Sequence, residues 1–209
     1  MSEKKGYNWT HNQADNSFSY LFKSLDYILE KELKNKNSLL DIGCGNGYLT
    51  KKLSEKFIKV IAVDNSNSAV QQAKKDYEGN INFNFGNLED LKISDKFDCI
   101  TLIEVIEHLY SPDNLLKNIS EICDENTKII ISTPFHNFIK NLLILFSGKF
   151  DNHFSPLWEN GHIKFFSKNT LIKLCERNNF KIENIYYSGR FYPLSKSMIF
   201  VLSKSSKKL

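Results

Sequence analysis

The stretch LLDIGCGNG, residues 39–47, limits what this chain can fold into more than any other. Its apolar first half predicts a buried strand, and three glycines follow at alternate positions before the helical pattern of Tyr48–Phe57. Glycines allow positive φ angles and let a ligand lie directly against the backbone, while the start of a helix offers free N–H groups. The spacing G-x-G-x-G differs from the G-x-G-x-x-G that holds a dinucleotide pyrophosphate. The stretch therefore predicts a ligand-cradling turn of another kind.

This stretch resembles the first motif of the class I S-adenosylmethionine-dependent methyltransferases. The resemblance continues along nearly the whole chain through VDNS, EVIEHL, STP and GHIKFFS, and it is closest to the O-methyltransferases of ubiquinone biosynthesis. It implies S-adenosylmethionine as the cofactor and an α/β fold. The expected sheet is seven-stranded, mostly parallel, doubly wound and Rossmann-like, with an antiparallel C-terminal hairpin and a helical insertion after the fifth strand.

Composition agrees with one globular domain over residues 1–209. The chain has 41% hydrophobic and 25% charged residues and a net charge of +4, which is too small to indicate nucleic-acid binding by itself. Its four cysteines lie far apart without a C-x-x-C pair, so we expect buried thiols in a reducing compartment. The polar N-terminus has no signal-peptide pattern, and no apolar run is long enough to span a membrane. We therefore expect a cytoplasmic protein.

Alternating apolar runs and helical patterns follow one another along the chain. The predicted strands are Ser38–Ile42, Lys59–Asp64, Ile81–Phe85, Phe97–Ile103, Lys128–Thr133, Phe180–Tyr187 and Ser197–Leu202. The predicted helices are Ser17–Lys36, Tyr48–Phe57, Asn67–Tyr77, Asp113–Cys123, Phe138–Phe146 and Ser167–Asn179. The last two strands have no helix between them and should pair antiparallel.

An acidic residue ends the second predicted strand. The Asp64 carboxylate could accept both ribose hydroxyls of an adenosyl group, although it could instead cap the following helix. In the resembling family the loop after the third strand holds the adenine, usually through an Asp where this chain has Asn87, and Leu88 would pack on the adenine face. The cofactor residues that the resemblance implies are Asp41, Gly43, Cys44, Gly45, Gly47, Asp64, Asn65, Asn87 and Leu88.

Two segments are expected to cover the site, an N-terminal one that in the resembling family folds over the cofactor and an insertion on the acceptor side. Residues 1–36 form an N-terminal cap, in which Tyr20 is expected to serve helix packing. Residues 134–166 are a long insertion at the carboxyl ends of the parallel strands, where an acceptor lid belongs. The insertion contains the apolar helix Phe138–Phe146 and an aromatic, histidine-rich segment behind it. We expect this helix to cover the acceptor, with contact to a membrane surface as a further hypothesis; a lid that packs without touching substrate is the alternative.

The motif EVIEH follows the fourth strand and carries the candidate catalytic groups. Glu104, Glu107 and His108 are spaced so that one helical turn would present them together, and His162 in the insertion could complete a divalent-metal site. Two carboxylates favour Mg²⁺ or Mn²⁺. The RNA 2′-O-methyltransferases, which share this motif, imply the same ligands; His153 could replace His162. Without a metal, His108 or His162 would act as the base. His136 could reach the same place.

These features predict an O-methyltransferase that acts on a hydroxyl of a small-molecule or lipid-like acceptor. The resemblance suggests a phenol or quinone precursor, and a sugar hydroxyl is an equal alternative. RNA 2′-O-methylation is a second enzyme class, opposed by the low net charge and the lack of an evident basic face. A cofactor-binding module without turnover is the non-enzymatic alternative, and the retained Glu104, Glu107 and His108 argue against it.

Overall fold

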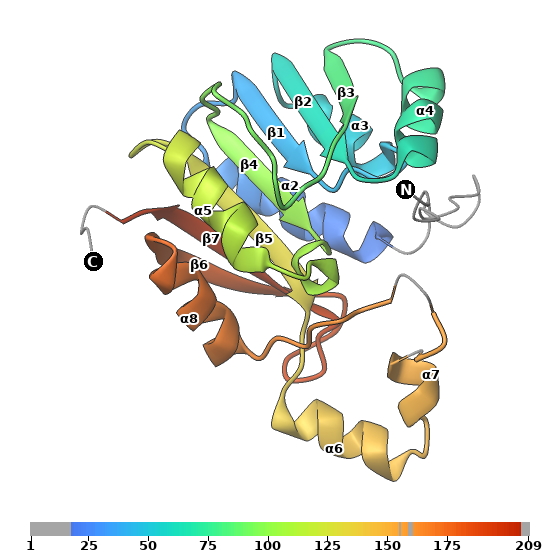
Figure 1. The fold of residues 1–209 in the computed structure, drawn as a ribbon. Helices are drawn as coiled ribbons and strands as arrows, with labels where there is room; N and C mark the ends of the chain where they lie inside the picture. The colour runs from blue at the N-terminus through green and yellow to red at the C-terminus, as the bar shows by residue number, and fades with distance from the viewer. Residues whose placement is uncertain (1–17, 155, 159–160, 206–209) are drawn as a thin grey trace.

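The computed structural model of the chain describes residues 18–154, 156–158 and 161–205. Its centre is a seven-stranded sheet in the order β3-β2-β1-β4-β5-β7-β6 (Figure 1). The strands are β1 (Ser38–Ile42), β2 (Lys59–Asp64), β3 (Ile81–Phe85), β4 (Cys99–Ile103), β5 (Lys128–Pro134), β6 (Phe180–Ser188) and β7 (Ser197–Lys204). The first five run parallel, and β7 lies antiparallel to both β5 and β6. The predicted fold class is confirmed.

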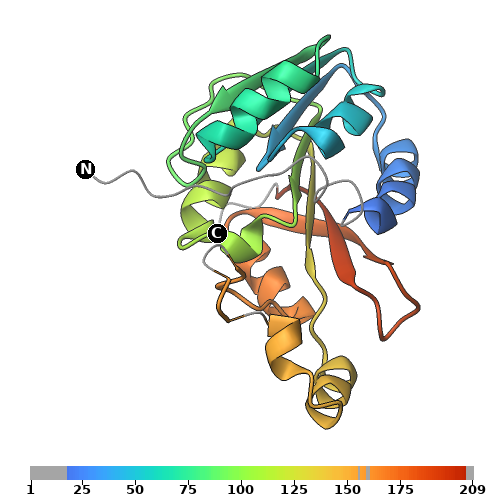
Figure 2. The same cartoon turned by 90° about the vertical axis from the view of Figure 1, so that its right-hand side faces the viewer.

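Helices cover both faces of this sheet. They are α2 (Ser19–Glu32), α3 (Tyr48–Ser54), α4 (Asn67–Asp76), η1 (Ile106–His108), α5 (Pro112–Ile122), α6 (Phe138–Phe146), α7 (Phe150–Phe154) and α8 (Lys168–Arg177). Figure 1 shows α5 and α8 in front of the sheet and α2 behind it. In Figures 1 and 2, α6 and α7 project below the body, beyond the carboxyl end of β5.

Consecutive apolar residues in the strands face opposite sides of the sheet. Leu39 packs in the cluster that contains Leu25 and Leu29 of α2, whereas Leu40 packs in the cluster that contains Leu116 of α5 and Leu174 of α8. A strand that is covered on both faces must be apolar at successive positions, because side chains alternate between the faces. The unbroken apolar runs in the sequence have this cause.

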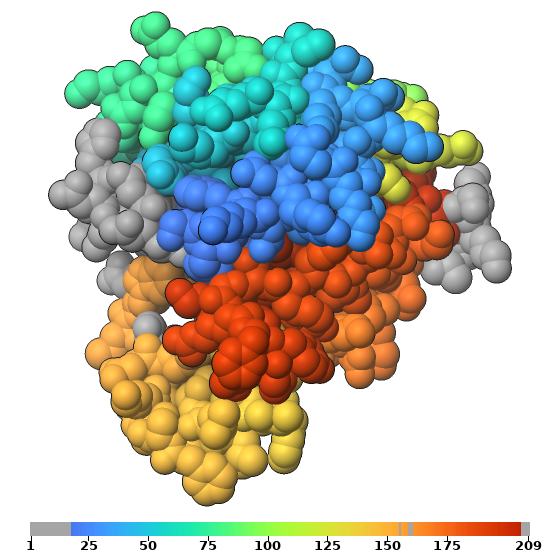
Figure 3. Space-filling model, turned by 180° about the vertical axis from the view of Figure 1, so that it is seen from behind, coloured from blue at the N-terminus to red at the C-terminus, as the bar shows by residue number. Residues whose placement is uncertain are grey.

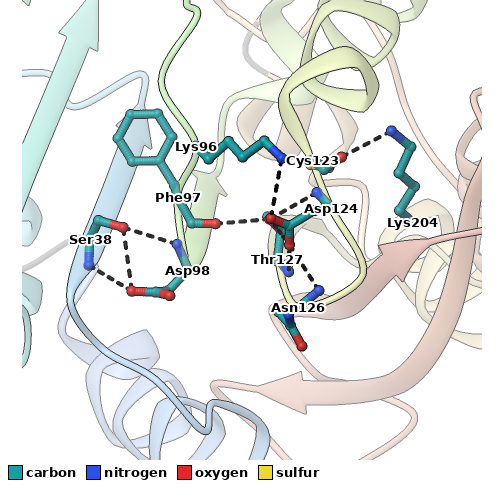
Figure 4. Close-up of polar contacts among 9 residues, drawn as sticks. All are labelled: Ser38, Lys96, Phe97, Asp98, Cys123, Asp124, Asn126, Thr127 and Lys204. Carbon is teal, nitrogen blue, oxygen red and sulfur yellow. Dashed lines mark hydrogen bonds and ion pairs between the residues drawn. The ribbon is translucent and has the colours of Figure 1, made fainter.

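Polar contacts fasten the amino ends of the central strands (Figure 4). The Asp98 carboxylate accepts hydrogen bonds from the backbone N–H of Ser38 at 2.9 Å and of Asn37 at 2.8 Å, joining β1 to β4. The Thr127 hydroxyl donates to the carbonyl of Phe97 at 2.9 Å and joins β4 to β5. This end of the sheet is closed by structural bonds, which leaves the opposite, carboxyl end for a binding site.

Predicted and observed elements differ mainly at their ends. Strands β1, β2 and β3 and helix α6 have the predicted bounds, while α2 and α3 end earlier than predicted. Ser167 caps α8 as predicted, in a reciprocal pair with Thr170. Helix α7 was not predicted. Residues 1–17, the first part of the predicted N-terminal cap, lie outside the described residues, as do 155, 159 and 160 of the insertion.

All four cysteines are free and buried, as predicted. Within the part of the chain that the structure describes, no helix is both long and apolar enough to cross a membrane.

Candidate active site

The glycine turn lies between β1 and α3, at the carboxyl end of the sheet. Gly43 and Gly47 both adopt φ of +80°, which side-chain-bearing residues rarely take. A Cβ on Gly43 would stand 2.3 Å from Val105 Cγ2, and a Cβ on Gly47 would stand 2.8 Å from the Phe83 ring. Glycine is therefore required at both positions by conformation and by space.

Asp64, at the tip of β2, fastens this turn to the sheet. Its Oδ2 accepts a hydrogen bond from the Gly45 N–H at 2.8 Å, and its Oδ1 accepts one from the Ser66 N–H at 2.8 Å. Only 8% of the residue is exposed, and burial raises the pKa of the carboxyl despite the bonds from these backbone N–H groups. The cap of α4 is the Ser66 side chain, which accepts from Ala69, so Asp64 does not have the capping role that the sequence left open.

Asp41 has a structural position beneath the turn. Its Oδ2 accepts from the Thr50 hydroxyl at 2.6 Å and its Oδ1 accepts from the Thr101 hydroxyl at 2.7 Å. The residue is 2% exposed. Both oxygens are thus used to join β1 to α3 and β4. The structure thus shows Asp41 supporting the turn, and its predicted contact with the cofactor stays a prediction.

The remaining predicted cofactor residues differ in exposure. Cys44 is buried under the turn, and Asn65 is exposed just past the tip of β2. Asn87 is exposed, with its amide donating to Asp90 Oδ2 at 2.5 Å and its carbonyl accepting from the Glu89 N–H at 3.1 Å. Leu88 is buried in the same cluster as Val63. The loop after β3 therefore lies beside the tip of β2, with Asn87 at its surface.

Glu104 follows β4 directly and has an unusual backbone, with φ of +55°. Its N–H donates to the Ser132 Oγ at 3.0 Å, and the Ser132 hydroxyl donates back to Glu104 Oε1 at 2.7 Å. Burial raises the pKa of this carboxyl to about 7. A left-handed residue interrupts any continuous helical turn, so the predicted single turn over Glu104, Glu107 and His108 does not form; the short 3₁₀ helix η1 begins only at Ile106.

Glu107, His108 and His162 converge at this point. One ligand atom of each lies within 4.8 Å of the others, which makes them a candidate metal group; Glu104 is not part of it. Glu107 is 0% exposed, and among the described residues neither of its carboxylate oxygens has a hydrogen-bond partner. Burial and the neighbouring Glu104 charge raise the pKa of Glu107. A buried carboxylate without partners is costly unless a cation or donor joins it.

Backbone contacts bring the insertion to this group. The Glu107 carbonyl accepts hydrogen bonds from the N–H groups of Ile163 and Lys164, both at 3.0 Å. His108 Nδ1 lies 3.2 Å from the Gly161 carbonyl oxygen, and the His108 and His162 rings are 4.9 Å apart. Because a carbonyl only accepts, Nδ1 of His108 carries the proton and Nε2 carries the lone pair.

His136 and His153 are not in the metal group but line the space next to it. The His136 ring lies 5.7 Å from that of His153 and 5.5 Å from that of Phe165, and it stacks on Phe154 at 5.8 Å. Burial lowers the pKa of His136 to about 4, as it does for His162, whose charged form the other histidines also disfavour. Four of the five histidines thus form two neighbouring ring pairs, His108 with His162 and His136 with His153 of α7.

Residues 11–185 of the chain match the family described as "Methyltransferase domain". The chain belongs to this methyltransferase family. Among its relatives are the ubiquinone biosynthesis O-methyltransferases of Coxiella burnetii, 28% identical over 77% of this chain and 70% of theirs, and of Glaesserella parasuis, 25% identical over 93% of this chain and 87% of theirs. The chain is a class I S-adenosylmethionine-dependent methyltransferase that resembles that group.

Solved methyltransferase structures share the fold. Magnesium protoporphyrin IX methyltransferase from Synechocystis, solved with bound SAH, superposes with a TM-score of 0.67 at 18% identity and covers 88% of this chain and 82% of its own. A Clostridium acetobutylicum S-adenosylmethionine-dependent methyltransferase gives 0.68 at 14% identity, covering 92% and 94%. Identities this low support the shared fold and leave the acceptor open.

Several polar residues of the methyltransferase site were missed by sequence reasoning. Thr50 and Thr101 hold Asp41, while Ser132 holds Glu104. Single serines and threonines carry no spacing signal of their own. Tyr20, assigned to helix packing, also places its hydroxyl 2.7 Å from Ser197 Oγ at the start of β7.

Proposed function

We propose that this methyltransferase transfers its methyl group to a hydroxyl of a small-molecule or lipid-like acceptor, assisted by a divalent cation at Glu107, His108 and His162. The observation that carries this proposal is the Glu107 carboxylate, fully buried and without a partner among the described residues, beside two imidazoles. A carboxylate ligand suits Mg²⁺ and Mn²⁺, and imidazole ligands suit Fe²⁺, Zn²⁺ and other first-row transition-metal ions. Phenols, quinone precursors and sugars all present a suitable hydroxyl.

The chemistry divides between cofactor, cation and protein. S-adenosylmethionine supplies an electrophilic methyl group for in-line displacement. A divalent cation supplies Lewis acidity, which lowers the pKa of an acceptor hydroxyl. The chain's residues hold the reacting groups in line, an effect worth up to about 7–11 kcal/mol of a barrier. In this proposal the glycine turn carries the methionine part of the cofactor, and Asp64 accepts from the ribose hydroxyls with its remaining lone pairs.

His108 and His162 have a second task, to take up the proton of the acceptor hydroxyl where no cation is bound. The Gly161 carbonyl fixes the tautomer of His108, with the proton on Nδ1 and the lone pair on Nε2. Burial holds His162 neutral by lowering its pKa to about 4. A neutral imidazole suits either role.

The surface of α6 supports an apolar acceptor. This helix buries none of its residues, and its apolar side chains include Phe138 at 79% and Phe146 at 81% exposed. Figure 3 shows the insertion as a protruding lobe below the β6–β7 hairpin, where Phe191 is also exposed. We include peripheral membrane contact through this lobe in the proposal, on the cytoplasmic side, because exposed apolar patches of this kind mark interaction surfaces.

Chelation tests the cation. Turnover with a panel of phenols, sugars and RNA oligonucleotides should fall in EDTA and recover with Mn²⁺ or Mg²⁺. Glu107→Gln should lose that recovery while still binding S-adenosylhomocysteine, and Glu125→Gln, an exposed acid far along the chain, serves as the matched control. Full activity after exhaustive chelation, with no metal by elemental analysis, would reject the cation and leave a histidine base. Activity on RNA alone would reject the acceptor class.

Vesicle flotation tests the membrane contact separately. The protein should float with anionic vesicles, and a Phe138→Ser/Phe146→Ser variant should remain in solution. Ile58→Ser, which removes an apolar side chain that is 73% exposed between α3 and β2, should float as wild type does. If wild type stays in solution with neutral and anionic lipids, only the acceptor-lid role of α6 survives.

A further inference from the structure

Glu89 fastens the loop after β3, residues 86–91, to the start of α5. Its carboxylate accepts hydrogen bonds from the backbone N–H groups of Tyr110 at 2.7 Å and Ser111 at 3.0 Å. The side-chain amide of Asn118, in α5, donates to the Glu89 carbonyl at 3.3 Å. One residue thus joins this loop to a distant helix through both its side chain and its backbone.

The start of α5 suits a carboxylate from another segment. Ser111 is the N-cap of this helix, but its own side chain makes no capping hydrogen bond. Backbone N–H groups at the start of a helix have no carbonyl of that helix to bond, and the helix dipole favours a negative charge there. Glu89 supplies this charge, so its side chain has a defined place although the residue is only half-buried.

Glu89 also fixes the orientation of Asn87. Asn87 Oδ1 accepts from the Glu89 N–H at 3.1 Å, and the Asn87 amide donates to Asp90 Oδ2 at 2.5 Å. Because an ionised carboxylate only accepts and a backbone N–H only donates, these two partners allow the Asn87 amide one orientation. Asn87 is exposed, so the second lone pair of its oxygen is available to a further donor.

The order of the strands places a purine base at this loop. The glycine turn follows β1 and Asp64 ends β2, which is the next strand of the sheet, and β3 lies beyond β2. With the methionine part at the turn and the ribose at Asp64, the base on the far side of the ribose falls beside the end of β3. The Gly86 N–H donates to the Asp64 carbonyl at 2.9 Å and holds the loop at this point.

We propose that Glu89 is a positioning residue for adenine recognition, which holds the loop on α5 and presents the Asn87 oxygen to the exocyclic amine of S-adenosylmethionine. This inference rests on the cofactor site of the proposed function. An amide oxygen accepts from the amine of adenine but has no donor to receive from the carbonyl that hypoxanthine carries in its place. Glu89 would then determine selectivity between these bases without touching either.

Two ligands that differ at this one group test the inference by calorimetry. Wild type should bind S-adenosylhomocysteine about 10-fold more tightly than S-inosylhomocysteine, which has the hypoxanthine base. Glu89→Ala should weaken S-adenosylhomocysteine binding about 10-fold and change S-inosylhomocysteine binding by less than about twofold, because the lost contact is one that only the amine makes. Glu89→Gln keeps an accepting oxygen and should recover most of the affinity. Glu78→Ala, an exposed position before β3, is the control and should bind both ligands as wild type does.

Asp90→Ala removes the acceptor of the Asn87 amide at an exposed position, so the inference stays testable if Glu89→Ala folds poorly. It should lower the selectivity for S-adenosylhomocysteine in the same direction. Equal losses for both ligands in Glu89→Ala would indicate a general effect on the loop and would overturn the positioning role. Wild-type selectivity in both alanine variants, or a wild type that does not distinguish the two ligands, would also overturn it and leave the cofactor site standing. A wild type that binds neither ligand would overturn the proposed cofactor site as well.

Discussion

Two buried carboxylates beside the glycine turn do different work at the scale of single residues. The two carboxylate oxygens of Asp41 accept hydrogen bonds from the hydroxyls of Thr50 and Thr101, and these bonds join three elements beneath the turn. Asp64 bonds two backbone N–H groups at the surface of the turn. Their sequence contexts are similar, since Asp41 is the second-last residue of β1 and Asp64 the last of β2, so only their hydrogen-bond partners distinguish them.

Asp64→Ala should weaken binding of S-adenosylhomocysteine by about 10–100-fold, because it removes one or two charge-assisted hydrogen bonds to the ribose and loosens the turn. Isothermal calorimetry measures the change. Asp76→Ala, at the end of α4, is the control and should bind as wild type does. Unchanged affinity in Asp64→Ala would remove this residue from the cofactor site.

Asp41→Asn should gain stability relative to wild type as the pH rises. Burial raises the folded-state pKa of Asp41 above its unfolded value of about 3.9. The stability that this group contributes is therefore fully present below the unfolded pKa and is lost as the pH rises through the folded pKa. Asn does not titrate. Urea unfolding at pH 4.5 and 7.5 measures the free energy of unfolding of both proteins. The wild-type value minus the variant value should fall as the pH rises, and a constant difference would contradict a raised pKa of Asp41. Exposed Asp151→Asn is the control.

At the scale of elements, helix α6 is attached to the body by its polar residues. The Lys140 ammonium donates to the carbonyls of Phe135 at 2.8 Å and Ser195 at 3.2 Å, and the Asn137 amide donates to the carbonyl of Pro193 at 2.7 Å. These bonds join the start of α6 to the β6–β7 loop, while its apolar side chains face outward. The helix is therefore held at one end.

Lys140→Met should loosen this attachment. Loss of the ammonium removes the donor from the carbonyls of Phe135 and Ser195. This should destabilise the attachment of α6 to the body by about 1–3 kcal/mol. Hydrogen exchange over residues 138–154 should accelerate, by roughly 5–150-fold if local opening dominates. Lys173→Met, at an exposed position of α8, controls for the loss of a charge. Exchange that is unchanged in this segment would show that other contacts hold the insertion.

At the scale of the whole molecule, the cofactor turn is built on the central strands, so ligand binding should stabilise the entire sheet. Gly43 N–H bonds the Val63 carbonyl at 2.7 Å, and Gly45 N–H bonds Asp64, which link the turn to β2. Three clusters of buried residues enclose the same strands. Unfolding of the sheet and loss of the turn are therefore expected to occur together.

S-adenosylhomocysteine at 100 times its Kd should add about 2.7 kcal/mol of stability, which corresponds to a rise in Tm of several degrees for a domain of this size. Differential scanning fluorimetry measures the shift, and adenosine at the same concentration is the control ligand. In Asp64→Ala the rise in Tm at the same ligand concentration should be smaller. A wild-type Tm that does not respond to the ligand would contradict the expected link between turn and sheet.

The sheet and the cofactor turn can be recognised from the amino-acid sequence. Buried parallel strands need apolar residues on both faces, so the runs that became β1 and β2 were visible with their bounds, and strict apolar–polar alternation marked β3. The positive-φ glycines of the turn are a local requirement that no other residue meets, so Gly43 and Gly47 were visible too. Both features depend on residues that are neighbours in the sequence, and the family resemblance rests on them.

Tertiary structure alone decided how the acid and histidine residues are grouped. Helical spacing predicted Glu104 on one turn with Glu107 and His108, but hydrogen bonds to Ser132, 28 residues later, accompany a left-handed Glu104 and place the residue apart. His162 joins Glu107 and His108 because the Glu107 carbonyl binds residues 163 and 164. Tyr20 meets Ser197 across almost the full length of the chain. Contacts between distant segments leave no periodic pattern in the sequence, which is why only the folded chain specifies them.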